Sequence, residues 1–302
     1  MNLRPPFNRC FNASFNYGIP LYEYAYICNP VTREYVVLPK FKGEELLTGT
    51  GFGYVPSTNE YKVVRIRNSR RDPNFGTVQI YTLGSGIGWR NVKKKMDYNL
   101  KRFFLGAQFF LGAQCGVFAN GAIHWVDDRG IIIAFSLADE EFRELPSPPC
   151  LGGNGNPLPL NLHVLDDYLY AYGTPYLDFD LWVLKKNQNY HDVCIWSKEF
   201  SNLSMYVKPI TFTKNGGLLC HDSRDEKVYR YSPDQASSSR MLVNIDKNFV
   251  SGIRHKNTLV SLKALGEEVT KLMDSGERAR TSGGTGTAVG ALPCIKKEET
   301  NL

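Results

Sequence analysis

The sequence predicts an all-β fold, a β-propeller of four-stranded blades, from three observations. First, one unit recurs five times: a short apolar run, a polar turn, and a second run that opens with an aromatic or basic residue. Second, the copies start about 50 residues apart, at Ala25, Val78, Ile132, Asp180 and Val228, and such a period is typical of propeller blades. Third, 13% aromatic residues and 27 glycines suit many short strands joined by tight turns.

The first repeat is incomplete. Only an outer hairpin, near residues 22–38, is clear in AYICNPVTREYVVLP. Residues 1–21 carry no strand alternation that we recognise, so we expect an irregular N-terminal segment there.

Each later repeat has a second hairpin in front of it. The turns of these hairpins include Asn120-Gly121 and Asn215-Gly216, and Asn-Gly between apolar runs is a strong hairpin signal. The repeats therefore predict four antiparallel strands each, which we letter a to d. The preceding hairpins cover Gly51–Ile66, Cys115–Val126, Leu162–Gly173 and Ile210–Cys220.

The C-terminal part changes character after the fifth repeat. Phe249–Leu262 is one more strand pattern and our candidate for the strand that closes the propeller, so that the domain spans residues 22–262. Within residues 263–302 we expect a short amphipathic helix and then a disordered Gly/Thr-rich tail. The helix would carry Leu265, Val269, Leu272 and Met273 on one face.

A tandem hexapeptide interrupts the pattern, because FFLGAQ at residues 103–108 is copied at 109–114. The simpler interpretation is a slippage duplication that lengthens a loop or strand. The alternative is a hydrophobic insert that binds a partner, since exposed phenylalanines would otherwise favour aggregation.

Composition limits the class of protein. The net charge of +6 is mild and indicates a solvated surface, so we expect no nucleic-acid partner. Seven scattered cysteines without C-x-x-C spacing predict reduced thiols and an intracellular location, cytoplasmic or nuclear. The chain shows neither a secretory leader nor an apolar run of about 18 residues, so we expect no membrane association.

Catalytic chemistry is not indicated by any motif. His191 and Cys194 have half of a metal-ligand spacing, but we expect a turn residue and a strand residue. Asp127-Asp128 and Asp166-Asp167 are expected to stabilise turns. His124 and Trp125 are expected in an inter-blade core. We therefore predict no enzyme activity, no metal and no cofactor.

Strand alternation divides the connections between two rims. The a–b and c–d turns share one, the a–b rim, and the b–c and d–a connections share the other, the b–c rim. The b–c rim holds the longer segments, where binding tends to reside: Arg67–Gly76, Lys93–Gln114, Ser147–Asn161, Gly173–Asp178 and Asp222–Lys227. Residue types enriched at binding hot spots make our partner-binding candidates Arg67, Arg70, Arg71, Tyr176 and Arg224.

Eight segments, in order, resemble a known family. They include CNPVTREYVVLP, GFGYVPSTNEYKVVRI, GVFANGAIHWV and KPITFTKNGGLLC. Over about residues 27–262 they are similar to the kelch-like F-box-associated domain of plant F-box proteins. That resemblance implies a non-catalytic β-propeller that captures the target protein of an SCF-type ubiquitin ligase.

The resemblance does not extend to the F-box itself, for which we see no sequence before Ile27. We therefore expect no binding to a Skp-type adaptor, and the target protein stays unknown. Two other classes remain open: a propeller enzyme with a site in its channel, and a basic propeller that contacts RNA. Convergent ionisable groups would favour the first, and a steep salt dependence of binding the second.

Overall fold

A computed structural model describes most of the strands and turns of the chain. The described residues are 8–16, 19–29, 31–39, 46–68, 76–92, 114–127, 130–149, 160–165, 168–173, 178–186, 194–213, 215–225, 227–232, 235–244 and 259–273. Every regular element among them is a β-strand. The chain divides into two compact units, Met1–Met205 with His255–Leu272, and Tyr206–Arg254 with Met273–Leu302.

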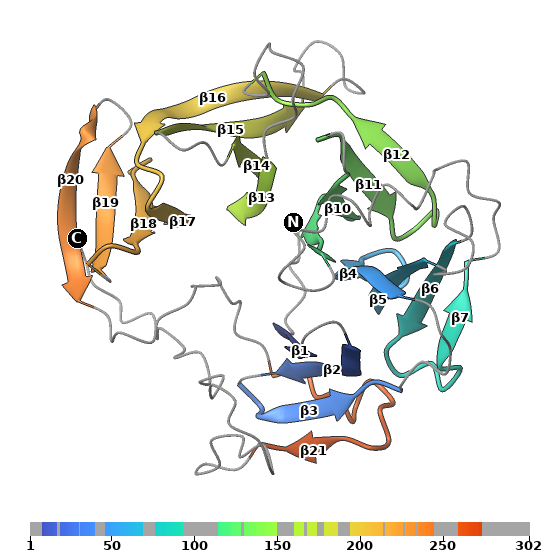
Figure 1. Cartoon of the computed structure of the whole chain (residues 1–302). Helices are drawn as coiled ribbons and strands as arrows, with labels where there is room; N and C mark the ends of the chain where they lie inside the picture. The colour runs from blue at the N-terminus through green and yellow to red at the C-terminus, as the bar shows by residue number, and fades with distance from the viewer. Residues whose placement is uncertain are drawn as a thin grey trace. The chain divides into compact units, whose positions relative to one another are not determined.

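Five sheets make up the fold, which is the predicted all-β propeller of four-stranded blades (Figure 1). All described pairings are antiparallel except that of the added strand β8 with β4, which is parallel and gives the second sheet five strands. The first unit holds four of these sheets and the second unit holds the fifth. Within each sheet the strands follow the chain as a meander, apart from one added strand in each of the first two sheets.

The strands of the first unit form four sheets. The first has β1 (Asn8–Asn16), β2 (Ile19–Asn29), β3 (Glu34–Val37) and β21 (Lys271–Leu272). The second has β4 (Leu46–Val55), β5 (Glu60–Asn68), β6 (Gly76–Thr82), β7 (Trp89–Asn91) and β8 (Gln114–Cys115). The third has β9 (Val117–Ala119), β10 (Ala122–Val126), β11 (Ile132–Ser136) and β12 (Phe142–Leu145). The fourth has β13 (Leu160–Leu165), β14 (Tyr168–Gly173), β15 (Phe179–Lys186) and β16 (Cys194–Leu203).

The second unit holds one meander. Its strands are β17 (Val207–Phe212), β18 (Leu218–Asp222), β19 (Lys227–Ser232) and β20 (Gln235–Asn244). Neighbouring strands pair antiparallel throughout, with bulges in the pairing of β17 with β18 and of β19 with β20.

Alternation along the strands builds three apolar layers inside the first unit. Between the first and second sheets the layer includes Ile27, Leu38 and Val63, and between the second and third sheets it includes Ile66 and Trp125. A third layer joins the third and fourth sheets. The four sheets of this unit therefore stack in chain order, because a single sheet cannot bury its own apolar faces.

The four tryptophans are buried or partly buried, as the repeat predicts. Trp125 and Trp196 are 1% and 8% exposed, and Trp89 and Trp182 are intermediate. Two of them tie consecutive sheets by the same hydrogen bond. Trp89 donates Nε1–H to the carbonyl of Pro39 at 2.8 Å, and Trp196 donates to that of Pro146 at 2.6 Å. Each proline follows the last strand of its repeat, so this bond repeats with the period of the sequence.

Turn chemistry also follows the sequence where the turns are described. Asn120 and Gly121 adopt φ values of 50° and 77°, which is the left-handed backbone that a type I′ hairpin turn requires. The turn at Asp166-Asp167 lies outside the described residues.

Two predictions at the ends of the domain are wrong. The N-terminal segment is not irregular, because β1 pairs with β2 from Asn8 to Asn16. The strand that joins the first sheet is β21, which pairs with Glu34 and Tyr35 of β3 (Figure 1). Of the proposed closing strand, residues 259–262 have no strand pairing, and 249–258 lie outside the described residues.

The second wrong prediction is the amphipathic helix after Leu262. Residues 263–270 form turns, and Val269 and Leu272 are 71% and 69% exposed. Gly266, with a φ of 101°, interrupts any helix there. The predicted tail from residue 274 onwards and most of the FFLGAQ duplication lie outside the described residues; only Gln114 is described, pairing in β8 with Gly49 of β4.

Candidate partner-binding surface

Of the five candidate residues on the predicted b–c rim, two are described. Arg70, Arg71 and Tyr176 lie outside the described residues. Arg67 is described but is not a loop residue, because β5 continues to Asn68 and leaves Arg67 only 4% exposed. Its assignment to an exposed loop is therefore wrong. The pairing of Arg67 with Thr77 extends the hairpin of β5 and β6 beyond the predicted end.

Arg224 lies in the turn between β18 and β19, on the b–c side of the fifth sheet. Its side chain is 56% exposed. The guanidinium donates two hydrogen bonds to the buried Asp222 carboxylate, from Nε to Oδ1 at 3.0 Å and from Nη2 to Oδ2 at 2.5 Å. The backbone N–H of Arg224 donates to the same carboxylate at 2.9 Å. Such forked, charge-assisted bonds fix a side chain in place, so Arg224 is held in one orientation towards solvent.

The ion pair sets the charge of this turn. Hydrogen bonding from Arg224 holds the pKa of the Asp222 carboxyl below its ordinary value, against the opposing effect of burial. The same bond to Asp222 raises the pKa of Arg224. Both groups therefore stay charged across the physiological range, and the pair presents a fixed dipole at the surface.

Tyr206, which directly precedes β17, stands beside Arg224. The guanidinium carbon of Arg224 lies 5.1 Å from the centre of the Tyr206 ring, and Tyr206 is 44% exposed. Ser223 donates from its N–H and its hydroxyl to the Tyr206 carbonyl, each at 3.0 Å. The turn and the entry to β17 are thus joined, and they present an aromatic ring stacked on a cation, a combination common at binding hot spots.

A second carboxylate completes the turn. Asp225 accepts a hydrogen bond from the Tyr229 hydroxyl and lies 3.6 Å from the Lys227 ammonium. We define the Arg224 surface as Tyr206, Arg224, Asp225, Lys227 and Tyr229. Sequence reasoning found Arg224 but missed Tyr206, because nothing in the sequence distinguishes an exposed aromatic residue before a strand from a buried one.

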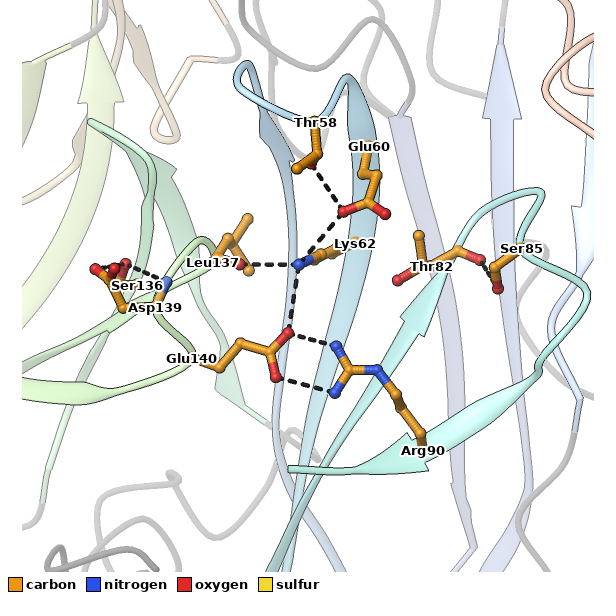
Figure 2. A network of polar contacts seen from close by, with 10 residues as sticks. All are labelled: Thr58, Glu60, Lys62, Thr82, Ser85, Arg90, Ser136, Leu137, Asp139 and Glu140. Carbon is orange, nitrogen blue, oxygen red and sulfur yellow. Dashed lines mark hydrogen bonds and ion pairs between the residues drawn. The ribbon is translucent and has the colours of Figure 1, made fainter. Parts of the chain in front are cut away.

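In the first unit, charged side chains at the a–b and c–d turns join the second and third sheets. Figure 2 shows Glu140, in the turn between β11 and β12, accepting hydrogen bonds from both terminal nitrogens of Arg90 on β7. Lys62 of β5 lies 3.3 Å from Glu140 and donates to the Leu137 carbonyl at 3.1 Å. The a–b turn of the second sheet and the c–d turns of the second and third sheets therefore share one rim, as predicted for these blades.

The remaining polar residues that the sequence singled out have structural partners. The buried Asp127 carboxylate accepts the N–H of Ile131 at 2.8 Å, which is the predicted turn role. His124 is buried, with Nδ1 3.3 Å from the Val117 carbonyl, and burial lowers its pKa to about 4. Trp125 fills the layer between the second and third sheets. His191 and Asp166-Asp167 lie outside the described residues.

Among the described residues, no group of three or more His, Cys, Asp or Glu side chains is placed to hold a metal ion. No described helix has the length and apolarity needed to cross a bilayer.

Comparison with known proteins identifies the family. Residues 11–158 match the family described as "F-box associated beta propeller domain". The chain is 26% identical over 259 residues to the putative F-box protein At1g53550 of Arabidopsis thaliana, covering 74% of this chain and 59% of that protein. It is 32% identical over 209 residues to the Arabidopsis F-box protein At3g07870, covering 58% of this chain and 45% of that protein.

The chain spans about half the length of the curated relatives that it matches. Among solved structures, an auxiliary nutrient binding protein from Bacteroides thetaiotaomicron aligns with a TM-score of 0.41 at 8% identity, over 74% of this chain and 52% of that one. That similarity is too weak to carry an argument, whereas the family match agrees with the stacked sheets and with the segments that suggested it. The chain thus carries an F-box-associated β-propeller domain of the kind found in plant F-box proteins.

Proposed function

We propose that this chain is a non-catalytic protein-recognition module, the part of an SCF-type ubiquitin ligase receptor that captures the protein to be ubiquitinated. The family match and the Arabidopsis F-box proteins related to this chain support the general role. The observation that carries the proposal in the structure is the exposed Tyr206–Arg224 pair. A preorganised aromatic and cation lose little side-chain entropy on binding.

The candidates for docking are the Arg224 surface of the second unit and, separately, the b–c connections of the first unit that hold Arg70, Arg71 and Tyr176. Arg67 is no longer a candidate, because its buried side chain would affect folding when it is changed. Arginine and tyrosine at the centre of an interface typically lose about 1 kcal/mol or more of binding free energy when truncated to alanine. We expect that effect for the best of Tyr206, Arg224, Arg70, Arg71 and Tyr176.

The test compares two exposed arginines, each paired with an aspartate. Arg143 has a 65% exposed side chain and an ion pair with Asp139 on the a–b rim. A target protein would be recovered by affinity purification with a grafted F-box, and its Kd measured by calorimetry for wild type, Arg224→Ala, Tyr206→Ala and Arg143→Ala. We expect at least a fivefold weaker Kd for the first two variants and an unchanged Kd for Arg143→Ala. Loss of binding from Arg143→Ala alone would place the docking face on the other rim.

Two further measurements separate the alternatives. A pull-down with a purified Skp-type adaptor measures recruitment independently of target capture. Titration of the target Kd against salt distinguishes protein recognition from nucleic-acid binding, since neutralised phosphates give a steep salt dependence. Such a slope, with RNA as the ligand recovered, would contradict the proposal.

A further inference from the structure

Residues 260–272, which we name the latch, join the first two sheets of the first unit. On the first sheet, Glu34 accepts hydrogen bonds from the Ser261 hydroxyl and the Leu262 N–H, both at 2.7 Å. Fully buried Asn29 donates from Nδ2 to the Val260 carbonyl at 2.8 Å. These contacts hold the latch largely through its backbone, at a sequence separation of more than 200 residues.

One apolar side chain of the latch is fully buried in the junction, and Val260 and Leu265 pack against the same cluster while partly buried. Leu262 is 0% exposed and packs in the layer that contains Ile27 and Leu38 of the first sheet and Tyr54 and Leu83 of the second. Burial of a leucine side chain stabilises such a junction. Leu262 is therefore the apolar anchor of the latch.

The latch also inserts one carboxylate. Glu267, 7% exposed, accepts the Gly84 N–H at 2.8 Å and the Tyr81 hydroxyl at 3.1 Å. A backbone bond from the Glu267 N–H to the Leu262 carbonyl, at 3.2 Å, fixes the spacing of the two anchors. The second sheet thus supplies a preformed carboxylate site made of one backbone donor and one phenol.

Close backbone contact defines the fit between the carboxylate site and the latch. A Cβ atom added to Gly84, whose φ is 72°, would lie 1.5 Å from the Leu265 carbonyl oxygen. Gly266, with a φ of 101°, faces the Gly84 carbonyl, 2.7 Å from where its own Cβ would be. Only glycine at both positions allows this approach.

The rest of the latch makes few contacts. Its strand pairing is limited to the two residues of β21, and Val269 and Leu272 are exposed. One apolar anchor, one carboxylate anchor and backbone hydrogen bonds are the means by which grooves recognise peptides. The groove between the first and second sheets therefore has the properties of a peptide site that already contains its ligand.

We propose that this groove is a peptide-binding site for turn-forming segments with a leucine and, five residues later, a glutamate, and that the chain's own latch occupies it in cis. This inference does not rest on the proposed function, because it concerns none of the residues of the Arg224 surface. A tethered ligand acts at an effective concentration in the millimolar range, so a peptide in trans binds only when the latch is weakened or outcompeted.

The experiment exchanges the latch for a peptide. The full chain with Gly266→Ala carries a latch that no longer fits, while its groove is unchanged. The probe is a fluorescent synthetic peptide with the sequence of residues 259–273, and binding is measured by anisotropy. We expect saturable binding to the Gly266→Ala chain and at least tenfold weaker binding to the wild-type chain, whose own latch competes.

Two controls test whether the peptide enters the groove. The peptide bearing Gly266→Ala should bind the Gly266→Ala chain at least tenfold more weakly. Adding Gly84→Ala to that chain should abolish binding of the wild-type peptide, whereas adding Gly86→Ala should not. Gly86 has a similar φ of 68° in the same connection, but its Cβ would meet nothing within 4 Å.

Two outcomes would overturn the proposal. One is a folded Gly266→Ala chain that fails to bind the wild-type peptide, or that binds it equally well with Gly84→Ala. The other concerns a Gly266→Ala chain that does not fold alone. Refolding with saturating peptide should then restore the wild-type near-UV circular dichroism spectrum. If it does not, the latch does not act as a separable ligand.

Discussion

The two faces of the second sheet pack against their neighbouring sheets with different kinds of side chain. Alternate residues of β5 point to opposite faces, so Val64 and Ile66 meet the third sheet while Val63 meets the first. Towards the third sheet the buried cluster has no ionisable member, and the charges that join these two sheets, Glu140 with Lys62 and Arg90, lie at the rim. The face towards the first sheet adds three tyrosines, Tyr54, Tyr61 and Tyr81, and the carboxylate of the latch.

The comparison shows where the fold depends on local sequence and where it depends on chain closure. The second and third sheets are neighbours along the chain. Their junction forms from the alternation of apolar side chains along the strands and from the glycines of β4. The junction of sheets one and two needs the latch, whose Glu267 is 186 residues from Tyr81. Bringing such distant segments together costs loop-closure entropy, which the anchors of the latch must offset.

The largest expected effect is at the apolar junction. Trp125 is 1% exposed and donates its indole N–H to the Thr50 carbonyl at 2.9 Å. Trp125→Ala should lower the free energy of unfolding by about 4 kcal/mol, since it removes a buried indole and leaves a cavity. Urea unfolding of both variants measures this against Trp89→Ala on the other face, where the ring is only partly buried. A larger loss for Trp89→Ala would reverse the comparison.

A smaller effect tests the glycines that bring β4 against the third sheet. A Cβ at Gly51 would lie 2.4 Å from Ile123 Cγ2, whereas a Cβ at Gly49 would approach nothing closer than Ile66 Cδ1 at 3.2 Å. Gly51→Ala should cost about 2 kcal/mol of unfolding free energy through overpacking, and Gly49→Ala less than half of that. Equal losses in thermal unfolding would show that strand propensity, not the close approach, selects glycine here.

At the latch the expected effect is smaller again. Glu267→Gln keeps the size of the side chain but removes the charge that Gly84 and Tyr81 bind. Losing a charge-assisted pair of this kind should cost about 1.5 kcal/mol. Hydrogen exchange of the Gly84 and Leu262 amides measures the effect locally, and both should exchange faster. Unchanged protection would mean that the carboxylate does not hold the latch.

The sequence predicted the repeated strands because period and turn chemistry are local properties. Asn120-Gly121 and the buried Trp125 follow directly from them. The latch could not be predicted from the sequence for two reasons. The apolar spacing around Gly266 also fits an amphipathic helix, and the partners of Glu267 lie far away in the sequence. Arg67 was misassigned for a related reason: a charged residue near a strand end looks like a loop residue until the pairing of β5 with β6 is known.

The smallest effect concerns the charged rim of the apolar junction. Burial raises the pKa of the Glu140 carboxyl, but its bonds to Arg90 and the charge of Lys62 outweigh this and leave the pKa below its ordinary value. Glu140→Gln should lower the free energy of unfolding by about 1 kcal/mol at pH 7, because the ion pair with Arg90 is only partly shielded from solvent.

The pH dependence of that variant gives the sharper result. A carboxyl whose pKa is lowered by folding contributes its stability above the unfolded pKa, about 4.3 for Glu, and loses it as the pH falls through the folded pKa. The difference in unfolding free energy between wild type and Glu140→Gln should therefore be constant from pH 7 to about 5 and vanish in stronger acid. Asp139→Asn is the control, since its exposed pair with Arg143 should change stability by less than about 0.5 kcal/mol at any pH. A Glu140→Gln difference that persists in acid would mean that the geometry of the turn, not the charge, joins the two sheets at this rim.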